Sequence, residues 1–193
     1  MANPKIHLVV AACRNRGIGM DGKIPWRLKK DMEFFKRITS ETENESKENV
    51  VIMGRKTWMS IPPKFRPLKN RVNIILSNTM TEPPDGAYLA NSFSEAMKLS
   101  TTGPMKDRIE SIHVIGGSSV YQEALNSNYD CRIFLTKVDA DFECDTFLPE
   151  FEEKATALVD NPANVPSEIQ TENGINFSFV VYDKIYPSSE FLK

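Results

Sequence analysis

The chain has 193 residues, of which 40% are hydrophobic and 26% charged, and its formal net charge is -2. This length and composition predict one globular domain over residues 1–193 and argue against disorder. The charge balance lacks the basic excess typical of nucleic-acid binding, and no apolar run approaches the roughly 20 residues of a membrane span. Three cysteines without CxxC spacing and two histidines predict neither a disulfide framework nor a metal site, so a reducing, cytoplasmic setting is expected.

The first expected element is a strand over residues 5–13, whose apolar run reads as buried β-structure rather than as a signal peptide. The next segment, GIGMDG at 17–22, matches the pattern G-x-G-x-x-G, but its context does not fit a dinucleotide fingerprint. Three residues separate it from the strand, and Pro25 biases Ile24 away from helical geometry. We therefore predict a mobile loop over a binding site, with the Rossmann fingerprint as the alternative.

A helix is expected over residues 26–38. At about 100° per residue, one face of this helix collects an apolar stripe. The stripe consists of Leu28, Met32, Phe34, Phe35 and Ile38. Asp31 projects from the middle of the stripe, which leaves two interpretations. It is either a first-turn acid that the helix dipole stabilises while its carboxylate reaches solvent, or a buried carboxylate that anchors a ligand.

Two strand–glycine–helix junctions follow along the chain. Gly54 precedes Arg55, Lys56 and Thr57, and the pair Gly116-Gly117 precedes Ser118 and Ser119; these residues begin the two helices. A helix start offers free N–H groups to an anion, and glycine lets a phosphate approach the backbone. The alternative is that the glycines only make tight turns and that the cations are solvated. Two such junctions in one sheet favour a ligand with several phosphates, such as a dinucleotide.

The remaining elements alternate in type. Further strands are expected over 49–54, 71–77, 111–117 and 131–138, and further helices over 55–61, 92–100 and 118–126. Polar segments at 39–49 and 160–168 are expected loops. Ser92, with Glu95 three positions later, predicts a capping box, and Ser118 is a second expected N-cap. The alternation predicts an α/β domain with a largely parallel sheet.

The final segment, residues 168–185, differs from this alternation. It contains an Asn-Gly turn signal at 173–174 between two extended runs. We predict a terminal hairpin that joins the edge of the sheet in antiparallel orientation.

Five blocks of the sequence resemble, in family order, the signature blocks of dihydrofolate reductase, most closely the eukaryotic monofunctional type. They are IPWRLKKDMEFF, VIMGRKTWMSIP, RPLKNRVNIILS, VIGGSSVYQEA and LTKVDADFECDTFLPE. The resemblance implies a mostly parallel eight-stranded sheet with an antiparallel C-terminal strand, flanked by helices. It also implies NADPH-dependent reduction of 7,8-dihydrofolate to 5,6,7,8-tetrahydrofolate, by hydride transfer to C6 and protonation of N5. Such an enzyme would supply one-carbon metabolism and thymidylate synthesis, bind antifolates as substrate analogues and act as a monomer.

The resemblance also assigns roles to individual residues. The implied catalytic residues are Asp31, which would bind the pterin 2-amino group and N3, Thr136, which would support it, and Trp26. The implied substrate-binding residues are Val9, Val10, Ala11, Met32, Phe35, Ser60, Ile61, Leu68, Arg71, Ile115 and Tyr121. The implied cofactor-binding residues are Ala11, Ile18, Gly19, Met20, Gly54, Arg55, Lys56, Thr57, Leu76, Ser77, Asn78, Asn91, Gly116, Gly117, Ser118, Ser119, Val120 and Tyr121. Gly19 and Met20 would belong to the mobile loop over the nicotinamide, and Arg71 would pair with the glutamate α-carboxylate of folate.

The chain departs from the family pattern at Asn78 and Asn91, where arginines often help to hold the 2′-phosphate of NADPH. Arg55, Lys56 and Ser77 remain available, so NADPH is the expected cofactor, but the strength of its preference over NADH stays open. Non-functional interpretations also remain for two residues: Arg71 could be an exposed cation, and Trp26 could be a packing residue.

Two rival functions are open at this stage. One is a pteridine or riboflavin-pathway reductase of the same fold, and the other is a non-catalytic protein that binds folate, or that binds nucleic acid for regulation. The acid at position 31 and Arg71 favour folate over the first rival. The acidic balance disfavours nucleic acid.

Overall fold

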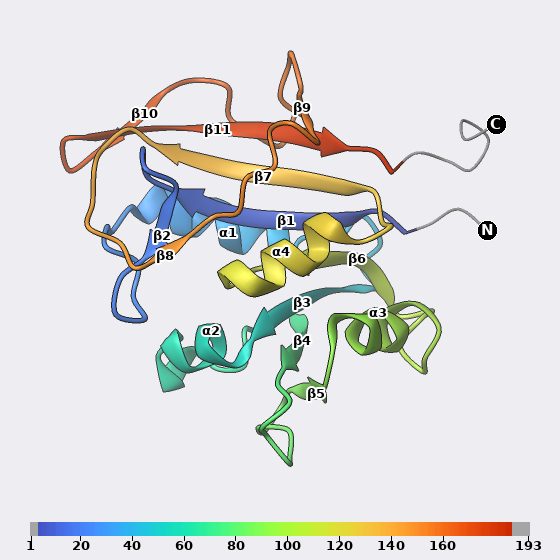
Figure 1. Cartoon of the computed structure of the whole chain (residues 1–193). Coiled ribbons are helices and arrows are strands. Elements are labelled where there is room, and N and C mark those ends of the chain that lie inside the picture. The colour runs from blue at the N-terminus through green and yellow to red at the C-terminus, as the bar shows by residue number, and fades with distance from the viewer. Residues whose placement is uncertain (1–3, 187–193) are drawn as a thin grey trace.

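The computed structural model describes residues 4–186 and has a twisted, mixed sheet at its centre (Figure 1). The order of the strands is β10-β11-β7-β1-β6-β3-β4-β5, and β9 pairs with β11 as a ninth, two-residue strand. The strands are β1 Ile6–Ala12, β2 Gly17–Gly19, β3 Glu48–Gly54, β4 Arg71–Leu76, β5 Tyr88–Ala90, β6 Ile109–Val114, β7 Cys131–Val138, β8 Thr146–Phe147, β9 Thr156–Ala157, β10 Gln170–Glu172 and β11 Ile175–Lys184. A separate two-stranded sheet joins β2 to β8.

The strands β7, β1, β6, β3, β4 and β5 run parallel to one another, and β11 runs antiparallel to β7. The predicted fold class is therefore confirmed, with β9 as an addition. The C-terminal hairpin is confirmed as well: β10 and β11 pair in antiparallel orientation around Asn173 and Gly174. Both turn residues have positive φ, 53° and 74°, the conformation that favours Asn-Gly in a two-residue hairpin turn.

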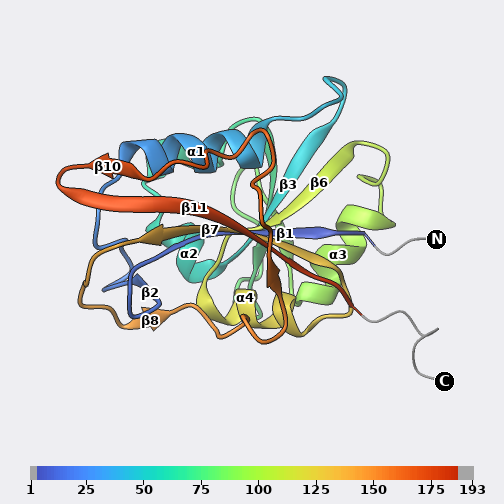
Figure 2. The ribbon, with the colours of Figure 1, turned by 90° about the horizontal axis from the view of Figure 1, so that it is seen from above.

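Four α-helices and one 3-10 turn connect the strands within residues 4–186. The helices are α1 Lys29–Ser40, α2 Arg55–Ser60, α3 Phe93–Thr101 and α4 Ser118–Asn126, and the 3-10 turn is η1 Pro63–Phe65. Seen from above, α1 lies on one side of the sheet, and α3 and α4 lie on the other (Figure 2). None of the helices in this part of the chain is long and apolar enough to cross a membrane.

Two predicted helix starts need correction. α1 begins at Lys29 rather than near Trp26, because the chain is still extended at its N-cap, Leu28. The N-cap of α4 is Gly117 rather than Ser118, which is the first helical residue, since Gly117 has the extended conformation that a cap requires. The cap at Ser92 is confirmed: its hydroxyl accepts a hydrogen bond from the Glu95 N–H at 3.2 Å.

The glycine-rich segment 17–22 forms the short strand β2 and a tight turn. The turn is closed by paired backbone hydrogen bonds between Met20 and Lys23, and the next helix starts only at Lys29. This geometry disagrees with the Rossmann fingerprint, in which the third glycine opens a helix. That the segment is mobile stays a prediction.

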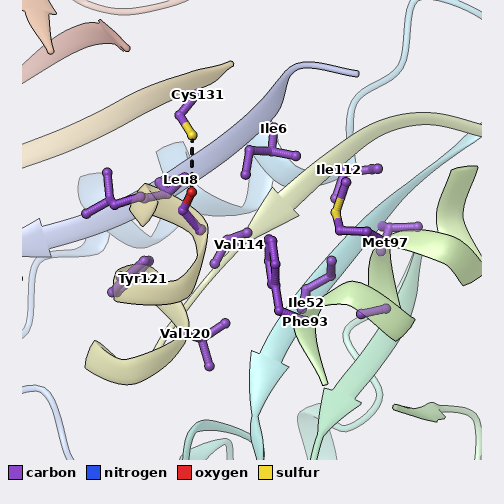
Figure 3. Close-up of a cluster of buried hydrophobic side chains, with 14 of the residues drawn as sticks. Ile6, Leu8, Ile52, Phe93, Met97, Ile112, Val114, Val120, Tyr121 and Cys131 are labelled. Atoms are coloured by element: carbon purple, nitrogen blue, oxygen red, sulfur yellow. Dashed lines mark hydrogen bonds between the residues drawn. The ribbon is translucent and has the colours of Figure 1, made fainter. Parts of the chain in front are cut away.

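Alternation along the strands directs side chains to two faces with different cores. Even-numbered residues of β1 and β3, such as Ile6, Leu8 and Ile52, pack under α3 and α4 in one continuous cluster (Figure 3). Odd-numbered residues face α1 and α2 and form two separate clusters. One surrounds Val9 and Phe34, and the other surrounds Met53.

Candidate active site

A cleft of about 2220 Å³ opens on the face of the sheet covered by α1 and α2. It reaches the carboxyl ends of β1, β3, β4 and β6, which meet at one edge because these strands are parallel. The cleft is lined by every predicted site residue except Met20. Met20 does not line the cleft in this structure, where its backbone is held in the turn of the 17–22 segment, so its contact with the cofactor stays a prediction.

Asp31 lies in the first turn of α1 and its carboxylate points to the sheet. Its Oδ1 accepts a hydrogen bond of 2.6 Å from the hydroxyl of Thr136, a residue of β7 that is only 2% exposed. Burial raises the pKa of Asp31 to about 6, although the Thr136 hydrogen bond opposes this shift. The solvent-directed interpretation of Asp31 is therefore wrong. The structure has a partly buried carboxyl, and its raised pKa brings its titration close to neutral pH.

Trp26 lines the cleft near the start of α1. Its indole ring packs against Phe142, with ring centroids 5.3 Å apart. The indole Nε1 is buried and has no hydrogen-bond partner within residues 4–186. A buried donor without a partner usually binds a water molecule or a ligand acceptor. Packing alone therefore does not account for Trp26.

Apolar side chains form the walls of the cleft. The predicted wall residues are Val9, Val10, Ala11, Met32, Phe35, Ile61, Leu68 and Ile115, all of which line it. Met32 does not pack into the core as its place on the predicted stripe suggested, since it is 61% exposed. Phe35 is half-buried and contacts both clusters of the α1 face. The walls suit a flat aromatic ligand better than a polar one.

Arg71 begins β4 and is half-buried at the side of the cleft. Its Nη1 donates to the Thr39 hydroxyl at 2.8 Å, and its Nε donates to the Lys69 carbonyl at 2.9 Å. Burial lowers the pKa of Arg71, but guanidinium groups remain charged in proteins. These two contacts fix the plane of the guanidinium, and the side chain is half-buried, so the interpretation of Arg71 as an exposed cation is wrong.

The two glycine junctions lie side by side at the cleft. The N–H of Gly54 donates to the carbonyl of Gly116 at 2.8 Å, which joins the end of β3 to the start of α4. Gly116 has a φ of 115°, and a Cβ there would stand 3.3 Å from the Tyr121 hydroxyl, so a side chain at this position would be strained. A Cβ on Gly117 would point toward Thr57, 3.5 Å from its hydroxyl. The bare backbone at this point is open to close approach by a ligand.

Tyr121 has a more structural place than its two predicted roles suggest. Its side chain is almost fully buried, and its hydroxyl donates to the Val9 carbonyl at 2.8 Å. Burial raises the pKa of this phenol, with a smaller effect from Asp31. Tyr121 lines the cleft only in part and mainly ties α4 to β1.

The predicted phosphate region lies around the ends of β3, β4 and β5. Arg55, Lys56, Asn78 and Asn91 are exposed there and line the cleft. The hydroxyl of Ser77 already accepts from the N–H groups of Thr79 and Met80, at 3.2 and 3.1 Å. Two cations and two amides are therefore directed to solvent at this end of the cleft. The other predicted members, Ile18, Gly19, Ser60, Leu76, Ser118, Ser119 and Val120, line it too.

Sequence reasoning missed several residues that line the cleft. They include the cations Lys36, Lys64 and Lys69, the aromatic Phe65, and the hairpin residues Glu172 and Asn173. Phe65 is 54% exposed, and a large apolar side chain in the proline-rich segment after α2 was a usable signal. Glu172 offered no local signal, because it reaches the cleft only through the pairing of the C-terminal hairpin.

Comparison with known proteins gives a consistent result. The family model described as dihydrofolate reductase matches residues 5–184. Dihydrofolate reductase of Sus scrofa is 45% identical over 181 residues, which cover 93% of this chain and 97% of the relative. The enzyme of Gallus gallus is 42% identical over the same coverage of this chain. The solved structure of Schistosoma mansoni dihydrofolate reductase matches with a TM-score of 0.84 and 39% identity, and covers 96% of this chain and 100% of that one.

Proposed function

The chain belongs to the dihydrofolate reductase family, and we propose that it reduces 7,8-dihydrofolate to 5,6,7,8-tetrahydrofolate with NADPH, by hydride transfer to C6 and protonation of N5. The proposal treats residues 1–193 as one reductase domain that acts as a monomer in the cytoplasm. The hydrogen-bonded pair of Asp31 and Thr136 at the floor of an apolar cleft supports it most strongly.

The Asp31 carboxylate is suited to the polar edge of a pterin. One of its oxygens is fixed by Thr136, and the carboxylate can accept hydrogen bonds from the 2-amino group and N3 of the ring. Burial raises the pKa of Asp31 to about 6, and these donors compensate the carboxylate for the hydration lost by burial. Binding of the pterin therefore favours the ionised form of Asp31.

Protonation of N5 needs a second route, since Asp31 faces the opposite edge of the ring. We assign this step to a water molecule admitted at the 17–22 segment. Asp31 assists by holding the pterin in the electronic state that accepts the proton at N5. The unpaired Nε1 of Trp26 is a donor that can order water beside Asp31.

The cofactor end of the cleft fits a dinucleotide. The bare backbone at Gly116 and Gly117 allows a diphosphate to approach, and the N-terminus of α4 provides free N–H groups. Arg55 and Lys56 supply positive charge for phosphate. NADPH, when bound, supplies the hydride, and the protein holds the two rings close together and keeps bulk water out.

The far end of the cleft suits the tail of folate. Arg71 has its guanidinium plane fixed by Thr39 and Lys69, which leaves its remaining terminal nitrogen without a partner within residues 4–186. A carboxylate can bind there with little loss of side-chain freedom. We propose that Arg71 binds the glutamate α-carboxylate of dihydrofolate.

Preference for NADPH over NADH rests here on Arg55, Lys56 and Ser77, because Asn78 and Asn91 cannot contribute charge. The Glu95 carboxylate, which accepts from the Asn91 N–H at 2.7 Å, adds negative charge nearby. We expect kcat/KM to be higher with NADPH than with NADH, and the ratio to increase in Asn78→Arg. Equal values for the two cofactors in the unmodified chain would overturn the NADPH assignment.

The experiment that tests the function is a turnover assay with dihydrofolate and NADPH, followed by the loss of reduced-nicotinamide absorbance. Formation of tetrahydrofolate is expected, and methotrexate-type antifolates are expected to inhibit it. An enzyme that oxidises NADPH only with another pteridine or with a riboflavin precursor would instead support the rival reductase.

A further inference from the structure

The helix that presents Asp31 has no side-chain cap of its own. The N-cap of α1 is Leu28, whose apolar side chain cannot accept hydrogen bonds. The first N–H groups of a helix have no partner within the helix, so they need acceptors from elsewhere. In α1 both carboxylate oxygens of Glu172 meet this need. One accepts from the Lys29 N–H at 2.7 Å, and the other accepts from the Lys30 N–H at 3.0 Å.

Glu172 is the last residue of β10, more than 140 positions away in the sequence. The next residue, Asn173, donates from its side-chain amide to the Arg27 carbonyl at 3.2 Å. On the same side, the Lys30 ammonium donates to the side-chain oxygen of Gln170 at 3.2 Å. The C-terminal hairpin therefore holds residues 27–30, the segment immediately before Asp31, by main-chain and side-chain contacts.

The second strand of the hairpin, β11, pairs with β7, which carries Thr136, the hydrogen-bond donor to Asp31. β11 pairs with β7 so that Phe179 lies opposite Thr136. Glu172 lies opposite Ile175 in the pairing of β10 with β11. One stretch of antiparallel sheet thus sets both the position of the helix start, through Glu172, and the position of the hydroxyl that Asp31 accepts from, through Thr136.

The charge of Glu172 also reaches Asp31. Asp31 accepts a hydrogen bond from the Thr136 hydroxyl of β7, and its charge interacts with the Tyr121 phenol of α4 and with the Glu172 carboxylate of β10. Glu172 acts in the same direction as burial and helps to raise the pKa of Asp31. A helix N-terminus alone would have the opposite effect, since its dipole favours a carboxylate. Glu172 neutralises that dipole from outside the helix, and its own pKa is lowered by the Lys30 and Lys29 N–H groups.

We propose that Glu172 is a positioning residue for the reaction, which fixes the first turn of α1 and sets the charge environment of Asp31 from the C-terminal hairpin. The effect on turnover rests on the function proposed above, whereas the effect on the titration of Asp31 does not.

The test uses the full chain with three substitutions. Glu172→Gln removes the charge and keeps one acceptor oxygen, and Glu172→Ala removes both acceptors. Glu168→Gln is the matched control, because it removes one carboxylate from the same part of the chain. The Glu168 side chain is exposed and makes no hydrogen bond or ion pair within residues 4–186.

Two readouts separate positioning from plain stability. The first is the pKa of the Asp31 carboxyl, followed by carbon-13 NMR against pH in the ligand-free protein. It is expected to fall in both Glu172 variants and to stay unchanged in Glu168→Gln. The second is kcat/KM for dihydrofolate against pH. In Glu172→Gln the acid limb of this profile is expected to move to lower pH. In Glu172→Ala the value of kcat/KM is expected to fall about fivefold, which corresponds to about 1 kcal/mol for a lost helix cap.

The proposal is overturned if the Asp31 titration in both Glu172 variants matches that of Glu168→Gln, even if their melting temperatures fall. It is also overturned if the pH profile of a folded Glu172→Gln enzyme equals that of the unmodified chain. Failure of the unmodified chain to reduce dihydrofolate would contradict the proposed function instead, and the NMR titration would still decide the electrostatic role of Glu172.

Discussion

On the face of the sheet covered by α3 and α4, one apolar cluster runs without interruption, and its buried polar side chains are paired. Ser100 donates to Ala96, and Lys184 donates to the carbonyls of Ser127 and Tyr129. The face covered by α1 and α2 has two smaller clusters with the cleft between them.

The second face also has the buried polar atoms without partners. Within residues 4–186 these are the Trp26 Nε1, the Asn49 Oδ1 and the His113 Nδ1. Unpaired buried polar groups and an incompletely filled core both reduce stability. The contrast indicates that the α3–α4 face supplies most of the packing stability, which allows the other face to keep a polar, open site.

The largest expected effect is on catalysis at the face covered by α1 and α2, which we call the polar face. Asp31→Asn is expected to lower kcat at neutral pH by about 10²–10⁴-fold, since the amide cannot supply the charge that the pterin donors require. Partial recovery is expected at low pH, where the substrate arrives protonated. Steady-state kinetics measures both, and an activity within about twofold of the unmodified enzyme would remove Asp31 from the mechanism.

Substitutions on the face covered by α3 and α4 should change the stability of the protein rather than its activity. Ile52→Ala deletes a fully buried side chain of the continuous cluster and is expected to cost roughly 2–5 kcal/mol of unfolding free energy. The KM for dihydrofolate should stay unchanged in the folded fraction. Denaturant unfolding together with kinetics checks this, and a large rise in KM with little loss of stability would break the division between the faces.

Acid should reduce stability through His7 on the polar face, whereas protonation of Asp31 acts in the opposite direction. Burial, with help from Arg132, lowers the pKa of His7 to about 4, and His7 lies 3.2 Å from the buried His113. Between these two pKa values, His7 therefore binds a proton in the unfolded chain but stays neutral in the folded chain. Stability from this group is complete above the unfolded value of 6.5 and is lost as the pH falls toward 4.

His7→Gln is expected to reduce the loss of unfolding free energy between about pH 7 and about pH 5 by about 2 kcal/mol. Urea unfolding at a series of pH values provides the measurement. Parallel curves of unfolding free energy against pH for the two proteins would show that the pKa of His7 is not lowered by folding.

The smallest effect on stability is expected at the cleft wall. Met32→Ala removes a mostly exposed side chain and should change unfolding free energy by less than about 0.5 kcal/mol. The KM for dihydrofolate should rise several-fold, because the side chain is one of the apolar walls. A Met32 variant with altered melting temperature and unchanged KM would place this residue in the core instead.

Most of the fold followed from local patterns. The apolar β-branched runs at β1, β3, β4, β6 and β7 specified buried parallel strands, and Asn173-Gly174 specified the hairpin, because period and turn chemistry act over a few residues. The start of α1 did not follow, since nothing local distinguishes Trp26 from a first helical residue. Met32 is exposed because it lines the cleft, and a helical wheel does not distinguish a cleft-lining position from a core position.

Some residues of the candidate site could likewise be predicted from local sequence patterns, and others could not. Asp31 was detectable as an acid on an apolar face, but its partner Thr136 is an ordinary strand residue that only the pairing of strands brings within 2.6 Å. Glu172 was invisible to pattern reasoning for the same reason. Residues that act through contacts between distant segments need either a structure or a family resemblance to be found.

The polar face keeps the partly buried carboxyl of Asp31 at a cost in stability. The folded-state pKa of Asp31, about 6, lies above the ordinary 3.8, so its stabilising contribution is present below 3.8 and is lost as the pH rises through about 6. The most direct test measures unfolding free energy and kcat/KM together for Asp31→Asn and the unmodified, ligand-free chain at about pH 8. We predict that the variant is more stable by about 2–3 kcal/mol and far less active. A variant that loses stability and activity together would contradict this account.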